Sequence, residues 1–133
     1  MSIRHLDYEA VLEINKGLIE RFGGKFSVIM EGNLRYCIET VLDIGNDHKN
    51  VLDRSIDKAA FYIHCISLAH GLLDCNKRTG YQCGDIFLRA NGFRLKVIET
   101  DEVVDMLRQV STKKVTVKFV EDWVRRHIKP VSP

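Results

Sequence analysis

The segment covering about residues 55–72 constrains the fold more than any other part of this 133-residue chain. Its apolar side chains would cover every face of a helix: Phe61, Tyr62, Ile63, Cys65, Ile66, Leu68 and Ala69. A helix that is apolar all round belongs at the centre of a bundle, where other helices surround it. We therefore predict a mostly helical protein built around this segment.

The flanking segments show the periodicity of helices that pack on such a centre. One apolar stripe follows three- and four-residue spacing before Gly23–Gly24, and a second covers one face of residues 34–42. We expect three further helices. The first runs from Asn76 to Asn91–Gly92, the second begins after a cap at Thr100 or Asp101, and the third begins after a cap at Thr116 and includes Ile128. Alternation over residues 93–97 indicates a short edge strand.

Two glycines, Gly80 and Gly84, lie four residues apart inside the predicted helix that begins at Asn76. A glycine in the interior of a helix costs roughly 1 kcal/mol relative to alanine. This spacing therefore suggests that another helix approaches closely at both positions.

Length and composition indicate one domain. With 45% hydrophobic and 29% charged residues the chain is an ordinary globular sequence, not a disordered one. Both prolines fall in the last four residues, and no repeat or linker divides the chain. We predict an all-α fold, a single domain over residues 1–133 with about six helices around the central buried one.

Charge and cysteine spacing exclude several classes of protein. A net charge of +2 is too balanced to indicate nucleic-acid binding. No two of the four cysteines have Cys-x-x-Cys spacing, which argues against a zinc ribbon or a redox pair of that type. The apolar stretch 61–73 is too short to cross a membrane, and the first residues lack a secretory signal. We expect a cytoplasmic protein with reduced thiols, without membrane or nucleic-acid partners.

The residues that indicate chemistry lie in the run His70-Gly71-Leu72-Leu73-Asp74-Cys75-Asn76-Lys77-Arg78-Thr79. The first turn of a helix has unpaired N–H groups and a positive dipole end, which together favour anions. Lys77 and Arg78 in that turn are unfavourable for an isolated helix. A phosphate bound over the helix start would offset this cost.

Three other polar residues of this run suit phosphate chemistry. His70 can accept a proton from a hydroxyl near neutral pH. Asp74 can hold Mg²⁺ on nucleotide phosphates, and Asn76 can donate its amide to a phosphate oxygen. These residue types alone are accounted for about equally well by helix caps and solvated charges.

The run "HGLLDCNKRTG" and the following "YQCGDIFLRANGF" resemble the death-on-curing (Doc) branch of the Fic/Doc, or Fido, superfamily. The family pattern is His-x-Phe-x-Asp-[Gly/Ala]-Asn-Lys-Arg-Thr, and six of its positions match here. Weaker similarity covers nearly the whole chain. The resemblance implies that His70 is catalytic, that Asp74 binds the metal, and that a phosphate-binding turn is formed by Cys75, Asn76, Lys77, Arg78 and Thr79.

Two positions depart from the pattern, and two others separate the two branches of the superfamily. Leu72 replaces the expected aromatic residue, and Cys75 stands where a small residue is expected. Cys75 is either a small apolar filler or a partly ionised, oxidisable thiol. Tyr81 occupies the place of a second arginine that AMP-transferring Fic enzymes use, and Lys77 replaces their glycine.

Similarity to the Doc branch implies a toxin of a toxin–antitoxin pair. Such a protein would use ATP and Mg²⁺ to phosphorylate a protein Ser/Thr hydroxyl, with elongation factor Tu as the expected target, and a small antitoxin protein would be its partner. Two alternatives stay open. One is transfer of AMP or another nucleotidyl group, and the other is a catalytically idle binding module.

The segment Ser27–Asn33 resembles the inhibitory motif of Fic enzymes, in which a glutamate pairs with the second arginine. In one interpretation Glu31 reaches Arg78 and restrains the enzyme. In the other, which we favour, the segment is structural and Asn33 caps the helix that follows.

Overall fold

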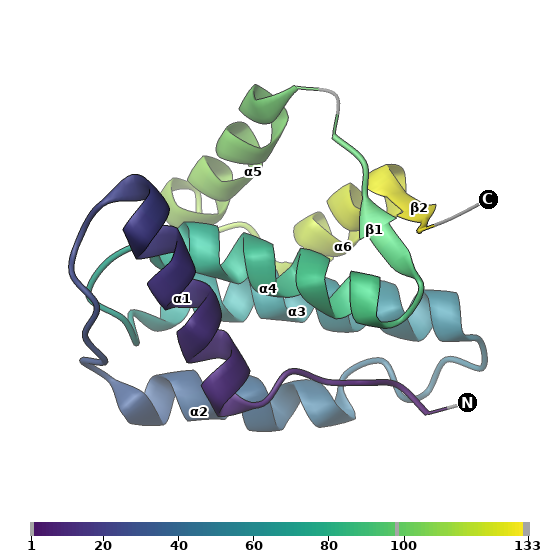
Figure 1. Cartoon of the computed structure of the whole chain (residues 1–133). Helices are drawn as coiled ribbons and strands as arrows, with labels where there is room; N and C mark the ends of the chain where they lie inside the picture. The colour runs from purple at the N-terminus through teal and green to yellow at the C-terminus, as the bar shows by residue number, and fades with distance from the viewer. Residues whose placement is uncertain (1, 98, 132–133) are drawn as a thin grey trace.

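The computed structural model describes residues 2–97 and 99–131, and the structural statements below refer to these residues (Figure 1). The elements follow in the order α1 (Tyr8–Phe22), α2 (Glu31–Thr40), the 3-10 turn η1 (Val41–Asp43), α3 (Val51–Ala69), α4 (Asn76–Ala90), β1 (Phe93–Leu95), α5 (Thr100–Thr112), α6 (Val117–His127) and β2 (Ile128–Pro130). The six helices and the small two-stranded sheet confirm the predicted all-α class.

Helix α3 lies at the centre, and its burial explains why the sequence is apolar on every face. Tyr62, Ile63 and Ile66 are completely buried, and helices α2, α4, α5 and α6 all contact α3. The helix begins at Val51, about four residues before the expected start, because the Asn50 side chain caps it by accepting the Asp53 N–H.

Helix α4 packs directly along α3, and two glycines make the close approach possible (Figure 1). A Cβ atom at Gly80 would lie 2.8 Å from the Ile63 carbonyl oxygen, and one at Gly84 would lie 2.7 Å from the Ile63 side chain. Both distances are too short for a real Cβ contact. The prediction from the glycine spacing is confirmed.

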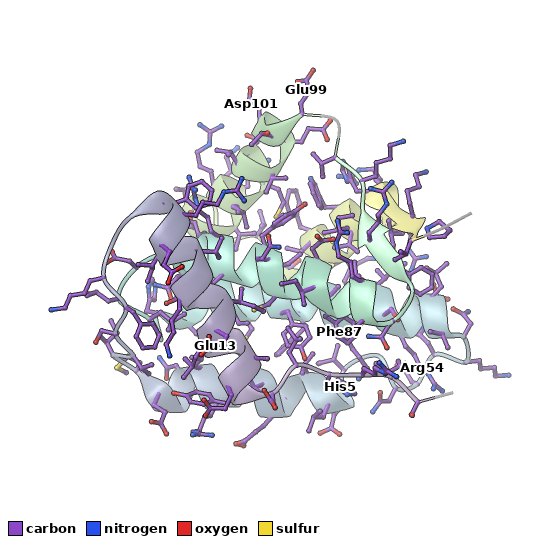
Figure 2. The ribbon with its side chains drawn as sticks, in the orientation of Figure 1. His5, Glu13, Arg54, Phe87, Glu99 and Asp101 are labelled. Carbon is purple, nitrogen blue, oxygen red and sulfur yellow. A yellow bond between two sulfur atoms is a disulfide. The ribbon has the colours of Figure 1, made fainter. Side chains whose placement is uncertain are left out.

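The N-terminal segment and α1 cover one side of the central pair. Asp7 caps α1 by accepting the Ala10 N–H, and Gly23 ends it with a φ of 90°. Figure 2 shows His5 beside Phe87 of α4, where the ring centroids lie 6.0 Å apart. These contacts hold the start of the chain against the core.

The end of the chain differs from the prediction. Strand β2 pairs with β1 in antiparallel fashion, with Phe93 opposite Pro130 and Leu95 opposite Ile128. The last helix therefore ends at His127, and Ile128 is not helical as expected. The reason is a pairing between segments far apart in the sequence, which local periodicity does not reveal.

Predicted caps and cysteines need correction too. Glu99, not Thr100 or Asp101, precedes α5, although Thr116 does precede α6. The expectation of reduced thiols is wrong for Cys37 and Cys65, which form a disulfide between α2 and α3. No helix in the described ranges is long and apolar enough to cross a membrane.

Candidate active site

The loop between the two central helices, residues 70–75, is held in an unusual backbone conformation. His70 ends α3 with a φ of 52°, and Cys75 precedes α4 with a φ of 64°. Non-glycine residues in this left-handed region carry local strain, and such residues cluster at functional sites. The loop is thus bent at both ends, at residues that the sequence had singled out.

His70 is exposed at the rim of a cavity whose floor includes the start of α4. Helix α4 begins at Asn76, as predicted, so Lys77 and Arg78 lie in its first turn beside unpaired N–H groups. Both cations are exposed. The imidazole, the helix start and the two cations therefore face one recess.

The recess has a volume of about 860 Å³ and is walled by α1, α3, α4, α5 and the loop between α3 and α4. The residues that line it are Leu18, Arg21, Phe22, Ser67, Leu68, His70, Leu73, Asp74, Cys75, Asn76, Lys77, Arg78, Tyr81, Gln82, Thr100, Val103, Val104, Leu107, Arg108 and Ser111. This volume lies within the usual range for small-molecule sites. The lining combines apolar side chains with a few charged ones, as such sites do.

The charges around the cavity favour an anion. Arg21 and Arg108 join Lys77 and Arg78 in its lining, whereas Asp74 is the one acidic residue among the lining residues of the described chain. Basic groups from three helices around one recess create a positive potential that concentrates anionic ligands. The arrangement suits a polyphosphate better than a cation or a neutral ligand.

Arg78 is oriented by an aromatic ring. Its guanidinium carbon lies 3.7 Å from the centroid of the Phe22 ring, a cation–π contact. Phe22 closes the last turn of α1 and is half exposed, so its ring supports the guanidinium from below without burying it. The charge of Arg78 stays available to a ligand in the cavity.

Asp74 is held by contacts from α1 and from the segment that follows it. Its Oδ2 accepts the Lys25 N–H at 2.8 Å, and its carbonyl oxygen accepts the Asn15 amide at 3.0 Å. A Cβ atom at Gly24 would lie 3.0 Å from the Asp74 Cβ, so the chain can pass this close at that position only as glycine. The carboxylate is thereby fixed at the cavity wall.

Asn76 and Thr79 brace the loop. The Asn76 amide donates to the Leu72 carbonyl at 2.7 Å, and its Oδ1 accepts the Leu72 N–H at 3.2 Å. Thr79 is completely buried, and its hydroxyl accepts the Asn15 amide at 2.9 Å. Thr79 is not among the residues that line the cavity. Cys75 does line the cavity, and Asn76 contributes one edge of it.

The segment before α2 forms a short antiparallel bridge with the loop. Val28 lies opposite Leu72, the Ile29 N–H donates to the Gly71 carbonyl at 2.8 Å, and the Leu73 N–H donates to the Ser27 carbonyl at 2.9 Å. Together with Asn76 these bonds satisfy both sides of the loop backbone, which therefore cannot shift without losing several of them.

Glu31 does not reach the site. Its carboxylate accepts a hydrogen bond from the Arg35 guanidinium at 2.8 Å, one turn further along α2, while Arg78 rests on Phe22. The structural interpretation of this segment agrees with these contacts, but its predicted cap is wrong. Asn33 lies inside α2 and donates its amide to the Ala69 carbonyl at 2.8 Å, next to His70.

Several residues of the site were not predicted from the sequence. Asn15, Arg21 and Phe22 belong to α1, and Arg108 belongs to α5, both far from the motif in sequence. Asn15 had a visible signal, because it is a polar residue one turn after Val11 on a face that is otherwise apolar. The two arginines are ordinary surface residues in sequence, and only the packing of the helices brings them to the cavity.

The chain is thus a helical protein with a basic cavity at the start of an internal helix. The model of the Fic/DOC family matches residues 5–88, which span α1 to most of α4 and include the whole loop. This chain belongs to the Fic/DOC family.

Two relatives point to one branch of that family. The chain is similar to "Protein kinase doc" of Escherichia phage P1, with 27% identity over 93% of this chain and 95% of the relative. It is similar as well to "Toxin Doc" of Mycolicibacterium smegmatis (strain ATCC 700084 / mc(2)155), with 32% identity over 82% of each chain. The resemblance to the Doc branch of the Fido superfamily is therefore confirmed.

Proposed function

We propose that this chain is a Doc-type toxin that transfers the terminal phosphate of ATP to a Ser or Thr hydroxyl of a protein. The observation that carries the proposal is the exposed His70 beside the start of α4, with Lys77 and Arg78 lining the same cavity. The names of the two relatives, a protein kinase and a toxin, support the direction of the proposal.

In this reaction the side chains and backbone of the protein position the reacting hydroxyl and neutralise the charge on the phosphates. The His70 imidazole accepts the hydroxyl proton as the oxygen attacks the γ-phosphorus, and the bond from that phosphorus to the bridging oxygen breaks to release ADP. Lys77, Arg78 and the N–H groups of the first turn of α4 neutralise the charge on the phosphates. Arg21 of α1 and Arg108 of α5 add positive charge to the cavity lining.

Mg²⁺ would be held by Asp74, the one carboxylate among the described residues that line the cavity. Asp74 uses Oδ2 for the Lys25 N–H, which leaves Oδ1 with no protein partner among the described residues. Mg²⁺ in nucleotide sites is typically held by one or two carboxylates together with the phosphates. When bound there, the ion would neutralise charge on the phosphates of the nucleotide.

The partners of the proposed toxin follow from the same relatives and from the surface. Phe22, Leu73 and Val104 are each about half exposed around the cavity mouth, an apolar rim that a protein partner can cover. We propose a small antitoxin protein as one partner, a cytoplasmic location, and a translation factor such as elongation factor Tu as the target.

Labelled ATP tests the proposal directly. The purified protein is incubated with a bacterial lysate, with purified elongation factor Tu in a parallel reaction, and with ATP labelled at either the α- or the γ-phosphate. We expect transfer of the γ-label only. The His70→Ala variant should slow transfer by about 10²- to 10⁴-fold, because the general base is lost.

His48→Ala is the matched control. His48 lies before the opposite end of α3, contacts Asp57 and is not part of the cavity lining, so its loss should leave transfer unchanged. Label from the α-phosphate would replace the proposal with AMP transfer. The absence of any label that depends on His70 would leave a binding module as the function.

A further inference from the structure

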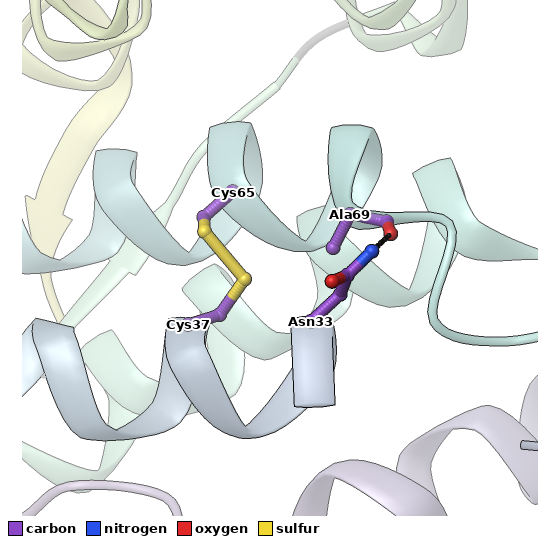
Figure 3. Close-up of a disulfide and its surroundings, with 4 residues drawn as sticks. All are labelled: Asn33, Cys37, Cys65 and Ala69. Carbon is purple, nitrogen blue, oxygen red and sulfur yellow. Dashed lines mark hydrogen bonds between the residues drawn. A yellow bond between two sulfur atoms is a disulfide. The ribbon is translucent and has the colours of Figure 1, made fainter. Parts of the chain in front are cut away.

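The disulfide between Cys37 and Cys65 is one of two adjacent links between α2 and α3 near the active loop. Figure 3 shows it beside the hydrogen bond from Asn33 to the Ala69 carbonyl. Asn33 lies one helical turn before Cys37, and Ala69 lies one turn after Cys65. The two links therefore lie one turn apart, and the second ends on the residue that precedes His70.

The two cysteine residues differ in their access to solvent. Cys37 is completely buried in the core, whereas Cys65 is partly exposed. Cys65 lines a surface cavity of about 370 Å³ together with Tyr36, Phe61 and His64 among others. A cavity of this size can hold a small thiol next to Cys65.

We propose that this disulfide is a thiol–disulfide exchange site for a small thiol of the glutathione class, and that its state sets how firmly α2 holds the His70 end of α3. The chemistry of exchange does not depend on the proposed kinase function. The effect of exchange is measured on the backbone of the loop, in the absence of ATP. The exchange proposal and the kinase proposal can therefore each fail independently of the other.

The exchange proceeds in two steps. A thiolate attacks Sγ of Cys65, forms a mixed disulfide there, and breaks the bond to Cys37, whose sulfur leaves with the electron pair and takes up a proton. A second thiolate attacks the external sulfur of the mixed disulfide and releases Cys65 as a thiol. Two small thiols thus become one small disulfide, and the protein gains two thiols. Oxidation is the reverse reaction, with the small disulfide as oxidant.

The link to the active loop runs through backbone bonds already described. Asn33 of α2 holds the Ala69 carbonyl, and the Gly71 carbonyl accepts N–H groups from both Ile29 and Met30, which directly precede α2. A shift of α2 away from α3 would therefore strain the bonds on both sides of His70. The disulfide opposes that shift, and reduction removes this restraint.

The first experiment identifies the sulfur that reacts. Cys37→Ala and Cys65→Ala variants are treated with oxidised glutathione, and modified peptides are mapped by mass spectrometry, which separates them from the partly exposed Cys75. We expect Cys65 in the first variant to be modified at least about tenfold faster than Cys37 in the second, because a buried thiol reacts only when the core opens. Equal modification rates of the two cysteines in folded variants, or no modification of Cys65, would contradict attack of the small thiol at Cys65.

The second experiment measures the effect on the loop. Amide hydrogen exchange of the oxidised protein is compared with that of the dithiothreitol-reduced protein and of a Cys37→Ala/Cys65→Ala variant. Faster exchange in residues 27–34 and 69–73, with unchanged exchange in α6, is expected in both. Unchanged exchange in the loop would refute the coupling. Unfolding of both thiol-free forms would show a permanent structural bond and overturn reversible exchange.

Discussion

At Asn76 a single side chain bonds both backbone groups of Leu72, a residue that is almost completely buried. The segment at Val28 pairs with one side of the loop backbone. On the other side, the Asn76 amide supplies the donor and the acceptor that a neighbouring strand would otherwise provide. The motif asparagine therefore has a structural role in addition to any contact with phosphate. His70 and Cys75 can keep their left-handed conformations because the loop between them is held in this way.

Asn76→Ala should destabilise the protein by about 2 to 3 kcal/mol, because two backbone groups of Leu72 lose their partners inside the protein. Urea unfolding measures this change, and hydrogen exchange of the Leu72 and Leu73 amides should become faster. Asn46→Ala removes one exposed amide bond, to the Leu42 carbonyl, and serves as the control. It should cost about 1 kcal/mol or less. Equal losses in the two variants would contradict the bracing role.

At the scale of elements, the contact between α3 and α4 determines where the loop ends can lie. The two helices meet so closely that a Cβ atom at Gly80 would lie 2.7 Å from the Ser67 hydroxyl and 2.8 Å from the Ile63 carbonyl oxygen. The carbonyl belongs to the helix backbone and cannot rotate away. The separation of the helices, and with it the position of His70 relative to the start of α4, depends on this glycine.

Gly80→Ala should therefore force the two helices apart and destabilise the protein by about 1 to 3 kcal/mol, in spite of the better helix propensity of alanine. Thermal unfolding of the variant measures the loss. Gly17→Ala is a matched control, since Gly17 lies inside α1 and a Cβ there would meet nothing within 4 Å. It should stabilise the protein by up to about 1 kcal/mol. A stabilised Gly80→Ala variant would show that the helices can move apart at no cost.

At the scale of the whole molecule, the basic side chains of the cavity come from three helices that are far apart in sequence. Arg21 comes from α1, Lys77 and Arg78 from α4, and Arg108 from α5. The positive potential of the cavity is therefore a property of the packed molecule and should disappear on unfolding. The disulfide between Cys37 and Cys65 contributes at the same scale, because it restricts the unfolded chain.

Reduction of this disulfide should lower the stability of the whole molecule. The two cysteines are 28 residues apart, and the entropy of closing a loop of that size corresponds to about 3 to 4 kcal/mol. The melting temperature should fall by on the order of 10 °C for a chain of this length. Differential scanning calorimetry with and without dithiothreitol measures the shift. The Cys37→Ala/Cys65→Ala variant, which lacks the bond, should show no response to dithiothreitol, and a wild-type melting temperature that is equally insensitive would argue against the bond.

The sequence alone determined the helical class, the central helix, the start of α4 at Asn76 and its end at Asn91–Gly92. These features rest on contacts between residues a few positions apart, or on the burial of a whole helix, and both leave a periodic pattern in the sequence. The spacing of Gly80 and Gly84 was informative as well, because glycines inside a helix indicate close packing by another helix.

Only the tertiary structure decided which residues complete the site. The Arg78–Phe22 contact, the Asn15 bonds to Asp74 and Thr79, the pairing of β1 with β2, and the Cys37–Cys65 bond all join segments from different elements. The burial of Thr79 followed from the same packing. Such contacts depend on the distances and angles between packed helices, and these arise from the fit of many side chains at once, which no local pattern contains.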